Sequence, residues 1–586
     1  MKIFKKESLF LYIILDFFVI PLLIYLYLSV PRIYASFSFS NWPDQFPSSY
    51  INLNLTFTLL IASFYYIFKL FLYKFTKITF LIFIQIILLL RFIDIEANRI
   101  FGFSFSPAFF ANLELESIKI VFVQYWLYFI IYMFIIILIF KTIIKIQFSK
   151  KYKKYNIIAT VLFFIIAVRS IVILNKESWH SDKNFASQLF IEQAYEYYKS
   201  ENLINDIKWT NTEIKTMKKL GYSFEGSINV KKSSGRLHKN LILIYLEGFN
   251  TEFTFAGGSP TQDLTPNLDR FALNNMFIKN FFNAVTPTIN SLVSSQCGLL
   301  PKFDNYSLDR YIYAPRIKCL SDHLNEMGYK QVLMQGTSVV FSGIRKFSNF
   351  HHYDEIIGRD EIKKIYPNKK NRLTSWGFND LDLFSAIKAK ISILKKEQPF
   401  HVSILTIDTH PPFEISPECP NYSNNQKHNA IHCLDYIIGD FLRFLEKQEL
   451  LLNTTILITG DHRMHGSIPF GKVFTALYDP DLKNNFPITN VINSFTPDIA
   501  PSILQLLGTE ITSMNIGKSF LSLRKEFQFL VSPNFILKEN NFKLIQKCPN
   551  KILKNTEINL SSGILNDCQV AKIDILYNNW ILKGRF

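Results

Sequence analysis

The chain has 586 residues, a net charge of +17 and a composition that is 49% hydrophobic, with 57 phenylalanines. This length is enough for a membrane part and at least one large folded domain. A positive charge suits either nucleic acid or an anionic membrane surface, but the lysines cluster beside apolar segments, which favours the membrane and argues against nucleic acid.

Residues 1–175 contain five apolar stretches, each long enough to cross a bilayer as a helix. The loops that follow the second and fourth stretches are rich in lysine, as is the N-terminus, whereas the other loops carry few positive charges. The positive-inside rule therefore places the lysine-rich loops in the cytoplasm and everything after about residue 176 outside. The first stretch lacks a small-residue cleavage site and is interpreted as an uncleaved anchor. The five expected spans lie near 9–30, 51–72, 77–97, 119–140 and 156–175.

The rest of the chain divides into three parts by composition. Residues 176–238 are polar and charged with helical stretches, and we interpret them as a juxtamembrane helical connector. Residues 239–525 alternate short apolar runs with helical patterns. After about residue 525 the pattern becomes strand-like and turn-like, which predicts a small β-rich region at 526–586.

Four apolar runs in the middle part predict buried strands, because each is short and bounded by polar residues. Helical patterns separate these runs, so we expect an α/β domain with a central, mostly parallel sheet covered by helices on both faces. No internal repeat stands out in the sequence. The runs are "LILIYL" (241–246), "KQVLMQG" (330–336), "FHVSILTIDTH" (400–410) and "TTILITGDH" (454–462).

All the cysteines lie after the last expected span. An even set confined to the outer part of a chain is typical of disulfides formed in an oxidising compartment. Several pairings are open, and nearest-neighbour pairing would join the cysteines in the order of the sequence. Free buried thiols are the alternative. The set is Cys297, Cys319, Cys419, Cys433, Cys548 and Cys568.

Acids and histidines follow three of the predicted strands directly. Glu247 follows the first, Asp408, Thr409 and His410 follow the third, and Asp461 and His462 follow the fourth, with His465 close behind. Such a residue after one strand is usually a turn or cap residue. In open α/β sheets, however, ligands bind beyond the carboxyl ends of the strands. Glu247, Asp461 and His462 together predict a site for one divalent ion, Mn²⁺ or Zn²⁺, with Mg²⁺ as a further candidate.

Thr288 lies where the segment "NAVTPTINSLVSSQCGLLP" (283–301) changes from a loop into a helix. It has two interpretations. In one, its side chain caps the helix. In the other, it is a nucleophile: a metal ion lowers the pKa of its hydroxyl, and the helix N-terminus offers N–H groups to a phosphoryl oxygen.

Several segments resemble, in the same order, those of the membrane-bound phosphoglycerol transferase and lipoteichoic acid synthase-like family of the sulfatase/alkaline-phosphatase superfamily. The resemblance covers about residues 240–510. It implies an extracytoplasmic catalytic domain of that fold behind a membrane anchor. The segments are "LTPNLDRF" (264–271), "TINSLVSSQCGLLP" (288–301), "MQGTSVVFSG" (334–343), "SWGFND" (375–380), "TIDTHPP" (406–412), "AIHCLDYI" (430–437) and "GDH" (460–462).

The resemblance implies roles for individual residues. Thr288 becomes the nucleophile and a metal ligand together with Glu247, Asp461 and His462, and His410 contacts the substrate phosphate or aids a proton transfer. Three further residues are candidates for binding the substrate: His465, Arg345 and Trp376. Each also has an ordinary structural interpretation, as a surface histidine, a solvated cation and an aromatic residue that fastens a loop.

One departure leaves the donor headgroup open. Lipoteichoic acid synthases carry a Trp-x-Arg element for glycerol phosphate, whereas this chain has Ser342 at the Trp position and Arg345 displaced by one. A Cys-x-Pro-x-Arg element is absent from the sequence, so sulfate ester hydrolysis is not expected.

The resemblance therefore implies a phosphotransferase of the bacterial inner membrane with its catalytic domain in the periplasm. The expected donor is phosphatidylglycerol and the expected acceptor a periplasmic or envelope glycan. The alternatives are a phosphoethanolamine transferase acting on lipid A or core sugars, a phosphodiester hydrolase, and an envelope sensor without catalysis.

Overall fold

The computed structural model describes residues 210–219, 239–261, 263–283, 285–301, 317–365, 373–397, 399–464, 471–482 and shorter segments between 489 and 573. The five expected spans and most of the expected connector lie outside these residues. Among the described helices, none is long and apolar enough to cross a membrane. The proposed domain boundaries therefore stay predictions.

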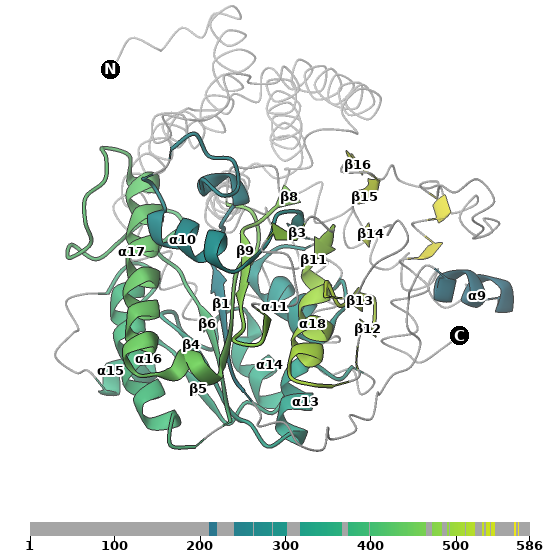
Figure 1. Cartoon of the computed structure of the whole chain (residues 1–586), viewed down its shortest axis with the longest axis horizontal. Coiled ribbons are helices and arrows are strands. Elements are labelled where there is room, and N and C mark those ends of the chain that lie inside the picture. The colour runs from purple at the N-terminus through teal and green to yellow at the C-terminus, as the bar shows by residue number, and fades with distance from the viewer. Residues whose placement is uncertain are drawn as a thin grey trace, which may run out of the picture. The chain divides into compact units, whose positions relative to one another are not determined.

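An eight-stranded sheet forms the centre of the described part, in the order β10-β2-β9-β7-β1-β6-β4-β5 (Figure 1). The five strands from β7 to β5 are parallel, whereas β9 is antiparallel to β7 and β2 is antiparallel to β9. The expectation of a mostly parallel sheet is thus confirmed. The strands are β1 (Asn240–Leu246), β2 (Met276–Ile278), β4 (Lys330–Gln335), β5 (Glu355–Ile357), β6 (Phe400–Leu405), β7 (Thr454–Gly460), β9 (Thr475–Tyr478) and β10 (Thr489–Asn490).

The central strand β1 is buried on both faces. Its side chains alternate between two hydrophobic clusters: Leu241, Leu243 and Tyr245 belong to one, and the residues between them belong to the other. This is the period of two that a strand imposes on its side chains. A continuous apolar run is therefore what a strand covered on both faces requires.

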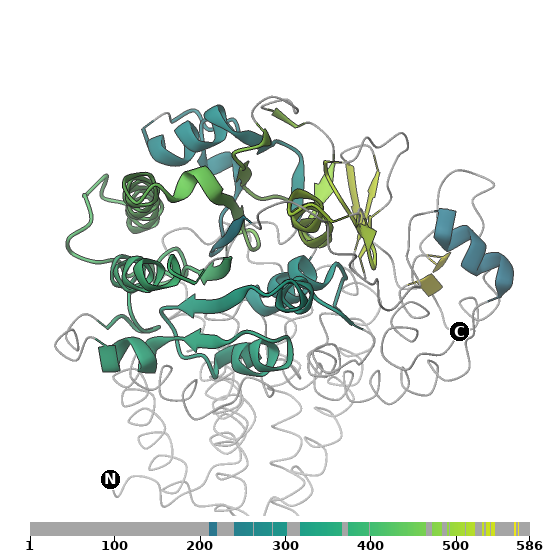
Figure 2. The same cartoon turned by 60° about the horizontal axis from the view of Figure 1, so that its bottom comes forward.

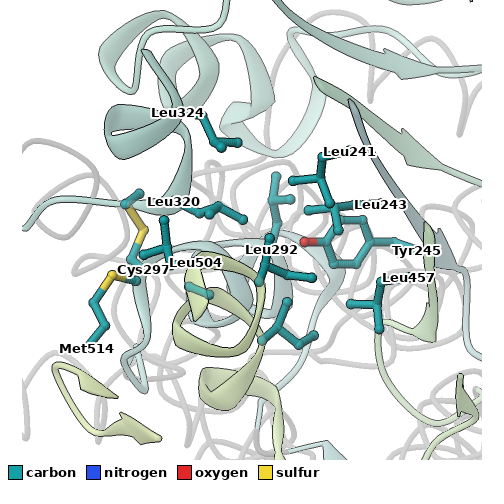
Figure 3. Close-up of a cluster of buried hydrophobic side chains, with 14 of the residues drawn as sticks. Leu241, Leu243, Tyr245, Leu292, Cys297, Leu320, Leu324, Leu457, Leu504 and Met514 are labelled. Atoms are coloured by element: carbon teal, nitrogen blue, oxygen red, sulfur yellow. A yellow bond between two sulfur atoms is a disulfide. The ribbon is translucent and has the colours of Figure 1, made fainter. Parts of the chain in front are cut away.

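Helices cover each face of the sheet. The face of Leu241 and Leu243 packs against α11 (Thr288–Cys297), α13 (Leu320–Glu326), α14 (Ile344–Phe350) and α18 (Ile499–Leu506). Figure 3 shows Leu292 of α11 beside Leu243, Tyr245 and Leu457. The opposite face packs against α10 (Pro266–Asn274), α15 (Arg359–Ile365), α16 (Asp380–Leu394) and α17 (Gln426–Lys447). Helices α16 and α17 lie side by side (Figure 1; Figure 2).

Helix starts and stops follow the local sequence. The side chain of Asn379 accepts a hydrogen bond from the N–H of Asp382 at the start of α16, and Asn425 caps α17 in the same way. Helix α11 ends at Gly298, whose φ of +65° lies in the left-handed region. A Cβ atom there would lie 2.4 Å from the carbonyl oxygen of Met514, so glycine is required for a close approach as well.

Smaller elements complete the described residues. A three-stranded sheet of β11 (Ser494–Phe495), β3 (Phe281–Asn283) and β8 (Gly471–Lys472) holds the chain just before Thr288. Near the C-terminus, β14 (Leu530–Ser532), β15 (Phe535–Lys538) and β16 (Asn541–Leu544) form an antiparallel sheet. The remaining elements are α9 (Asn211–Lys219), the pair β12 (Ser513–Met514) and β13 (Gly517–Lys518), and short 3₁₀ helices at Thr251–Phe253, Phe341–Gly343, Leu450–Asn453 and Thr496–Asp498.

Two disulfides join cysteines that are neighbours in the sequence. Cys297 at the end of α11 is bonded to Cys319, which precedes α13, and Cys419 is bonded to Cys433 of α17. Cys568 is also disulfide-bonded. Its expected partner Cys548 lies outside the described residues.

Candidate active site

The register of the neighbouring strands β1 and β7 brings the predicted ligands together. Leu246, the last residue of β1, is opposite Gly460, the last residue of β7. Glu247 and Asp461 therefore leave the same edge of the sheet as direct neighbours, and His462 follows. All three side chains are buried.

The ligand atoms of Glu247, Asp461 and His462 lie within 4.8 Å of one another. Nε2 of His462 is 3.5 Å from Oε1 of Glu247 and 3.4 Å from Oδ2 of Asp461. Two carboxylates around an imidazole nitrogen form a mixed O and N donor set, which suits Zn²⁺ or Mn²⁺.

The carboxylate of Asp461 supports this assignment. Its Oδ1 accepts hydrogen bonds from the backbone N–H groups of Gly248, at 2.8 Å, and His462, at 2.6 Å. Its Oδ2 is buried and accepts no hydrogen bond from the described residues. A buried carboxylate oxygen without a donor is costly, and a cation at this position would satisfy it. Gly248, with φ +54°, makes the turn that presents its N–H.

The tautomer of His462 also fits a ligand. Its Nδ1 is 2.9 Å from the carbonyl oxygen of Arg463. Because a carbonyl oxygen only accepts, Nδ1 carries the hydrogen and Nε2 keeps its lone pair. An Nδ1–H to carbonyl bond of this kind orients many metal-ligating histidines.

Thr288 points its hydroxyl at the same group of atoms. Its Oγ1 donates to Oε2 of Glu247 at 3.0 Å and lies 3.4 Å from Nε2 of His462. Thr288 is the first residue of α11, and Pro287 occupies the N-cap position without a side-chain cap. The hydroxyl is therefore directed at the proposed ligands and does not cap the helix.

Burial and like charge govern the electrostatics of the group. Burial, together with the neighbouring Asp461, raises the pKa of Glu247 to about 8. The pKa of His462 is raised because the two carboxylates outweigh the effect of burial. Both shifts indicate a site with excess negative charge, which a dipositive ion would neutralise.

His410 lies at the same edge of the sheet, after β6, and is nearly fully buried. Burial lowers the pKa of His410 to about 4, so the ring is neutral near pH 7. Its Nδ1 donates to the carbonyl oxygen of Pro411 at 2.8 Å, which leaves Nε2 as an acceptor. The same carbonyl accepts a hydrogen bond from the indole Nε1 of Trp376 at 3.0 Å. The rings of Trp376 and His410 pack edge to face, with their centroids 4.4 Å apart. Trp376 thus fixes the orientation of His410.

Arg345 and His465 were also predicted to bind the substrate. Arg345 has a half-exposed side chain that pairs with Glu361 at 3.3 Å. His465 lies outside the described residues. Their roles stay predictions.

Several supporting residues were not assigned from the sequence. The N–H of Glu247 donates to Oγ1 of Thr406 at 2.9 Å, and the hydroxyl of Thr409 donates to the carbonyl oxygen of Glu247. Asp380 accepts the N–H groups of Ile407 and Asp408. Thr406 and Thr409 come just after β6 and hold the ends of β1 and β6 together, whereas Asp380, at the start of α16, fixes the segment that follows β6.

Asp408 is the least expected group at this edge. It is buried, and neither of its carboxylate oxygens has a hydrogen-bond partner among the described residues. Burial and the adjacent Asp380 raise the pKa of Asp408 well above its usual value.

Comparison with known proteins agrees with the geometry. The sequence model of the sulfatase family matches residues 239–473. The chain is 28% identical over 306 residues to phosphoglycerol transferase I of Citrobacter koseri, covering 48% of this chain and 39% of that protein. It is 28% identical over 309 residues to the enzyme of the same name from Salmonella agona, covering 49% and 39%. The match thus spans about two fifths of the length of these relatives.

A solved structure shares the fold. The lipooligosaccharide phosphoethanolamine transferase A (EptA) of Neisseria meningitidis, an integral membrane protein, aligns with a TM-score of 0.55 at 12% identity, covering 87% of this chain and 98% of that one. The segment matched by the sulfatase model contains strands β1 to β8, Thr288 and the group of Glu247, Asp461 and His462, whereas β9 and β10 follow it. Residues 239–473 are therefore similar to the sulfatase family, and the chain shares the fold of EptA.

Proposed function

We propose that this chain is a membrane-anchored phosphotransferase that moves phosphoglycerol from phosphatidylglycerol to an envelope glycan. The observation that carries the proposal is the position of the Thr288 hydroxyl, 3.0 Å from Glu247 Oε2 and 3.4 Å from His462 Nε2. A threonine that only supported a helix would not need a buried set of metal-ligand side chains around its hydroxyl.

The names of the relatives give the reaction class. Two proteins called phosphoglycerol transferase I are 28% identical to this chain. Because 39% of their length is matched, the activity, the donor and the acceptor are proposals for this chain. The resemblance of the fold to an integral membrane transferase is consistent with an enzyme held beside its lipid donor.

In the first step, Oγ1 of Thr288 attacks the phosphorus of the donor. A bond forms between Oγ1 and phosphorus, the bond from phosphorus to the diacylglycerol oxygen breaks, and diacylglycerol leaves after taking up a proton. The product is a phosphodiester of Thr288 that carries glycerol. The N–H groups at the start of α11 face this phosphoryl group and stabilise its negative charge.

In the second step, a hydroxyl of the glycan attacks the same phosphorus. The bond to Oγ1 of Thr288 breaks, and the threonine hydroxyl is restored. Nε2 of His410 carries a lone pair because Nδ1 donates to Pro411. Nε2 of His410 can accept the proton that the acceptor hydroxyl loses. In its protonated form it can instead donate a hydrogen bond to a phosphoryl oxygen.

Glu247, Thr288, Asp461 and His462 would hold one divalent ion, for which Mn²⁺ and Zn²⁺ are the main candidates and Mg²⁺ a further one. When bound, such an ion lowers the pKa of the threonine hydroxyl and stabilises charge on the transferring phosphoryl group.

A phosphoethanolamine donor is the second candidate. Two observations favour it: Ser342 stands where lipoteichoic acid synthases carry the Trp of their glycerol-phosphate element, and Arg345 pairs with Glu361. The chemistry at Thr288 would be the same with either headgroup.

The test is to trap the intermediate on Thr288. Full-length protein in detergent is incubated with phosphatidylglycerol without acceptor, and the peptide containing Thr288 should gain the mass of glycerol phosphate. Thr288→Ala should abolish both the adduct and transfer, while Thr288→Ser should keep part of each, since a hydroxyl remains. Ser291→Ala is the matched control, because Ser291 is on the same helix but donates to the carbonyl oxygen of Val285.

Each other outcome has a defined meaning. An adduct with the mass of phosphoethanolamine, formed from phosphatidylethanolamine, would assign the second donor. Release of free glycerol phosphate at the same rate with and without glycan would indicate a hydrolase. A folded Thr288→Ala protein with normal turnover would rule out the mechanism.

A further inference from the structure

A second group of potential metal ligands lies at the other end of the helix that begins with Thr288. Cys297, Cys319 and His351 are all buried, and their ligand atoms lie within 4.8 Å of one another. In this structure the two cysteines form a disulfide. The imidazole of His351 adjoins it, with Nε2 at 3.5 Å from Sγ of Cys319.

Asp322 orients that imidazole. Its Oδ2 is 2.8 Å from Nδ1 of His351, and it also accepts the backbone N–H of Cys319 at 2.7 Å. The same Oδ2 accepts the N–H of Cys319, so Nδ1 of His351 donates to it and Nε2 faces the sulfurs. A carboxylate behind a histidine is the arrangement that supports many zinc-ligating histidines.

We propose that the dithiol form of this protein binds one zinc ion through Cys297, Cys319 and His351. The dithiol form exists before the disulfide is made, or after a dithiol reductant converts the disulfide into two thiols and is itself oxidised to a disulfide. Zinc then displaces the two thiol protons and is bound by two thiolates and Nε2 of His351, with water as the fourth ligand.

The spacing of these groups suits zinc. Tetrahedral zinc, with Zn–S of about 2.3 Å and Zn–N of about 2.0–2.1 Å, places a sulfur and a nitrogen ligand about 3.5 Å apart. Nε2 of His351 and Sγ of Cys319 are 3.5 Å apart. Two thiolates without a covalent bond separate, which opens the space between them for the ion. Soft thiolate ligands also favour zinc over Mg²⁺ or Mn²⁺.

The zinc ion would replace the disulfide as the link between α11 and α13. Cys297 ends α11 and Cys319 precedes α13, so either a covalent bond or a shared zinc ion fixes one helix against the other. Helix α11 would thus be held in its place while the chain still has thiols.

The experiment uses the full-length protein in detergent, reduced with a dithiol that is then removed by gel filtration, beside the unreduced protein. The reduced protein should bind one more equivalent of zinc. With Co²⁺ in place of zinc it should show thiolate-to-cobalt charge-transfer absorption. The catalytic group contains no cysteine, so a metal ion bound there gives no such absorption and the two sites are distinguished.

Variants locate the site. Cys297→Ser and His351→Ala should each remove the additional equivalent, and Asp322→Asn should weaken it by about 10- to 100-fold. His352→Ala is the matched control, because His352 also contacts Asp322, at 2.7 Å, but its side chain is 59% exposed and it is not one of the proposed ligands. The double variant Cys419→Ser, Cys433→Ser should keep the signal.

Two results would overturn the inference. One is a reduced protein that binds no additional zinc and shows no charge-transfer absorption. The other is a signal that survives both Cys297→Ser and His351→Ala, which would place it on other thiols. If Cys297→Ser fails to fold, His351→Ala and Asp322→Asn decide the matter, because both keep the disulfide that forms in the unreduced protein.

Discussion

Without a metal ion, Glu247 makes the folding stability of the protein depend on pH. In the metal-free protein its pKa is raised from 4.5 to about 8. The folded state therefore binds more protons than the unfolded state between these pH values, and folding stability falls as the pH rises through that range. The limiting slope is about 1.4 kcal/mol per pH unit.

Glu247→Gln should remove this slope. Chelator-treated wild-type protein should lose unfolding free energy between pH 5 and pH 8 by about 1–4 kcal/mol more than the variant does. Added Mn²⁺ or Zn²⁺ should raise the Tm of the wild type, by mass action, but not that of the variant. Denaturant unfolding at the two pH values measures the first effect, and thermal unfolding with and without the ion measures the second. Equal pH slopes in the two proteins would mean that Glu247 is not buried beside Asp461 as described.

At the scale of single elements, β1 links the metal-ligand group to α11. Tyr245 lies two residues before Glu247, and its hydroxyl is 3.0 Å from Oγ of Ser295 and accepts from Nε2 of Gln296 at 3.1 Å. Oγ of Ser295 itself donates to the carbonyl oxygen of Leu292, so the tyrosine hydroxyl donates to it. One strand therefore holds both the proposed ligand and the helix of the nucleophile.

Tyr245→Phe should cost about 1–3 kcal/mol of stability, because Gln296 loses a buried partner. It should also lower kcat, by up to about 100-fold, since a small shift of α11 misplaces Thr288. Tyr353→Phe is the matched control: that buried hydroxyl is 2.9 Å from Oγ of Ser403 and does not touch α11. The control should lose similar stability and keep kcat. Equal kcat values for the two variants would contradict the linkage.

The same elements explain how far the sequence could predict the fold. Strands β1, β4, β6 and β7 were predictable because their apolar runs are bounded by polar residues. Strands β2 and β9 were not, because Met276–Ile278 and Thr475–Tyr478 are short and their antiparallel pairing depends on contacts between distant segments. A local pattern carries no such information.

Part of the candidate site could likewise be predicted from the sequence, and part could not. That Glu247, Asp461 and His462 lie together follows from their positions directly after neighbouring parallel strands. Thr406 and Asp380 act through hydrogen bonds to the backbone of other segments, which spacing along the chain does not reveal. The orientation of Arg345 toward Glu361 likewise depends on tertiary structure.

At the scale of the whole molecule, the arrangement across the membrane is the main untested prediction. The lysine distribution predicts that a reporter fused after residue 150 is cytoplasmic and that one fused after residue 180 is periplasmic. Alkaline phosphatase and green fluorescent protein fusions at each position measure this, because the two reporters are active on opposite sides of the membrane. Activity of both fusions on one side would contradict five spans.

The length of helix α11 determines the direction in which Thr288 points. Its ten residues run from Thr288 to Cys297, and the cysteine end is tied to Cys319. Because an α-helix turns by about 100° and rises by about 1.5 Å for each residue, the number of residues before the tie sets the direction in which Thr288 points. One alanine inserted between Leu292 and Val293 should therefore turn the hydroxyl away from Glu247 and abolish transfer, even where the disulfide still forms. An insertion that leaves transfer intact would show that the length of α11 is not what aims the nucleophile.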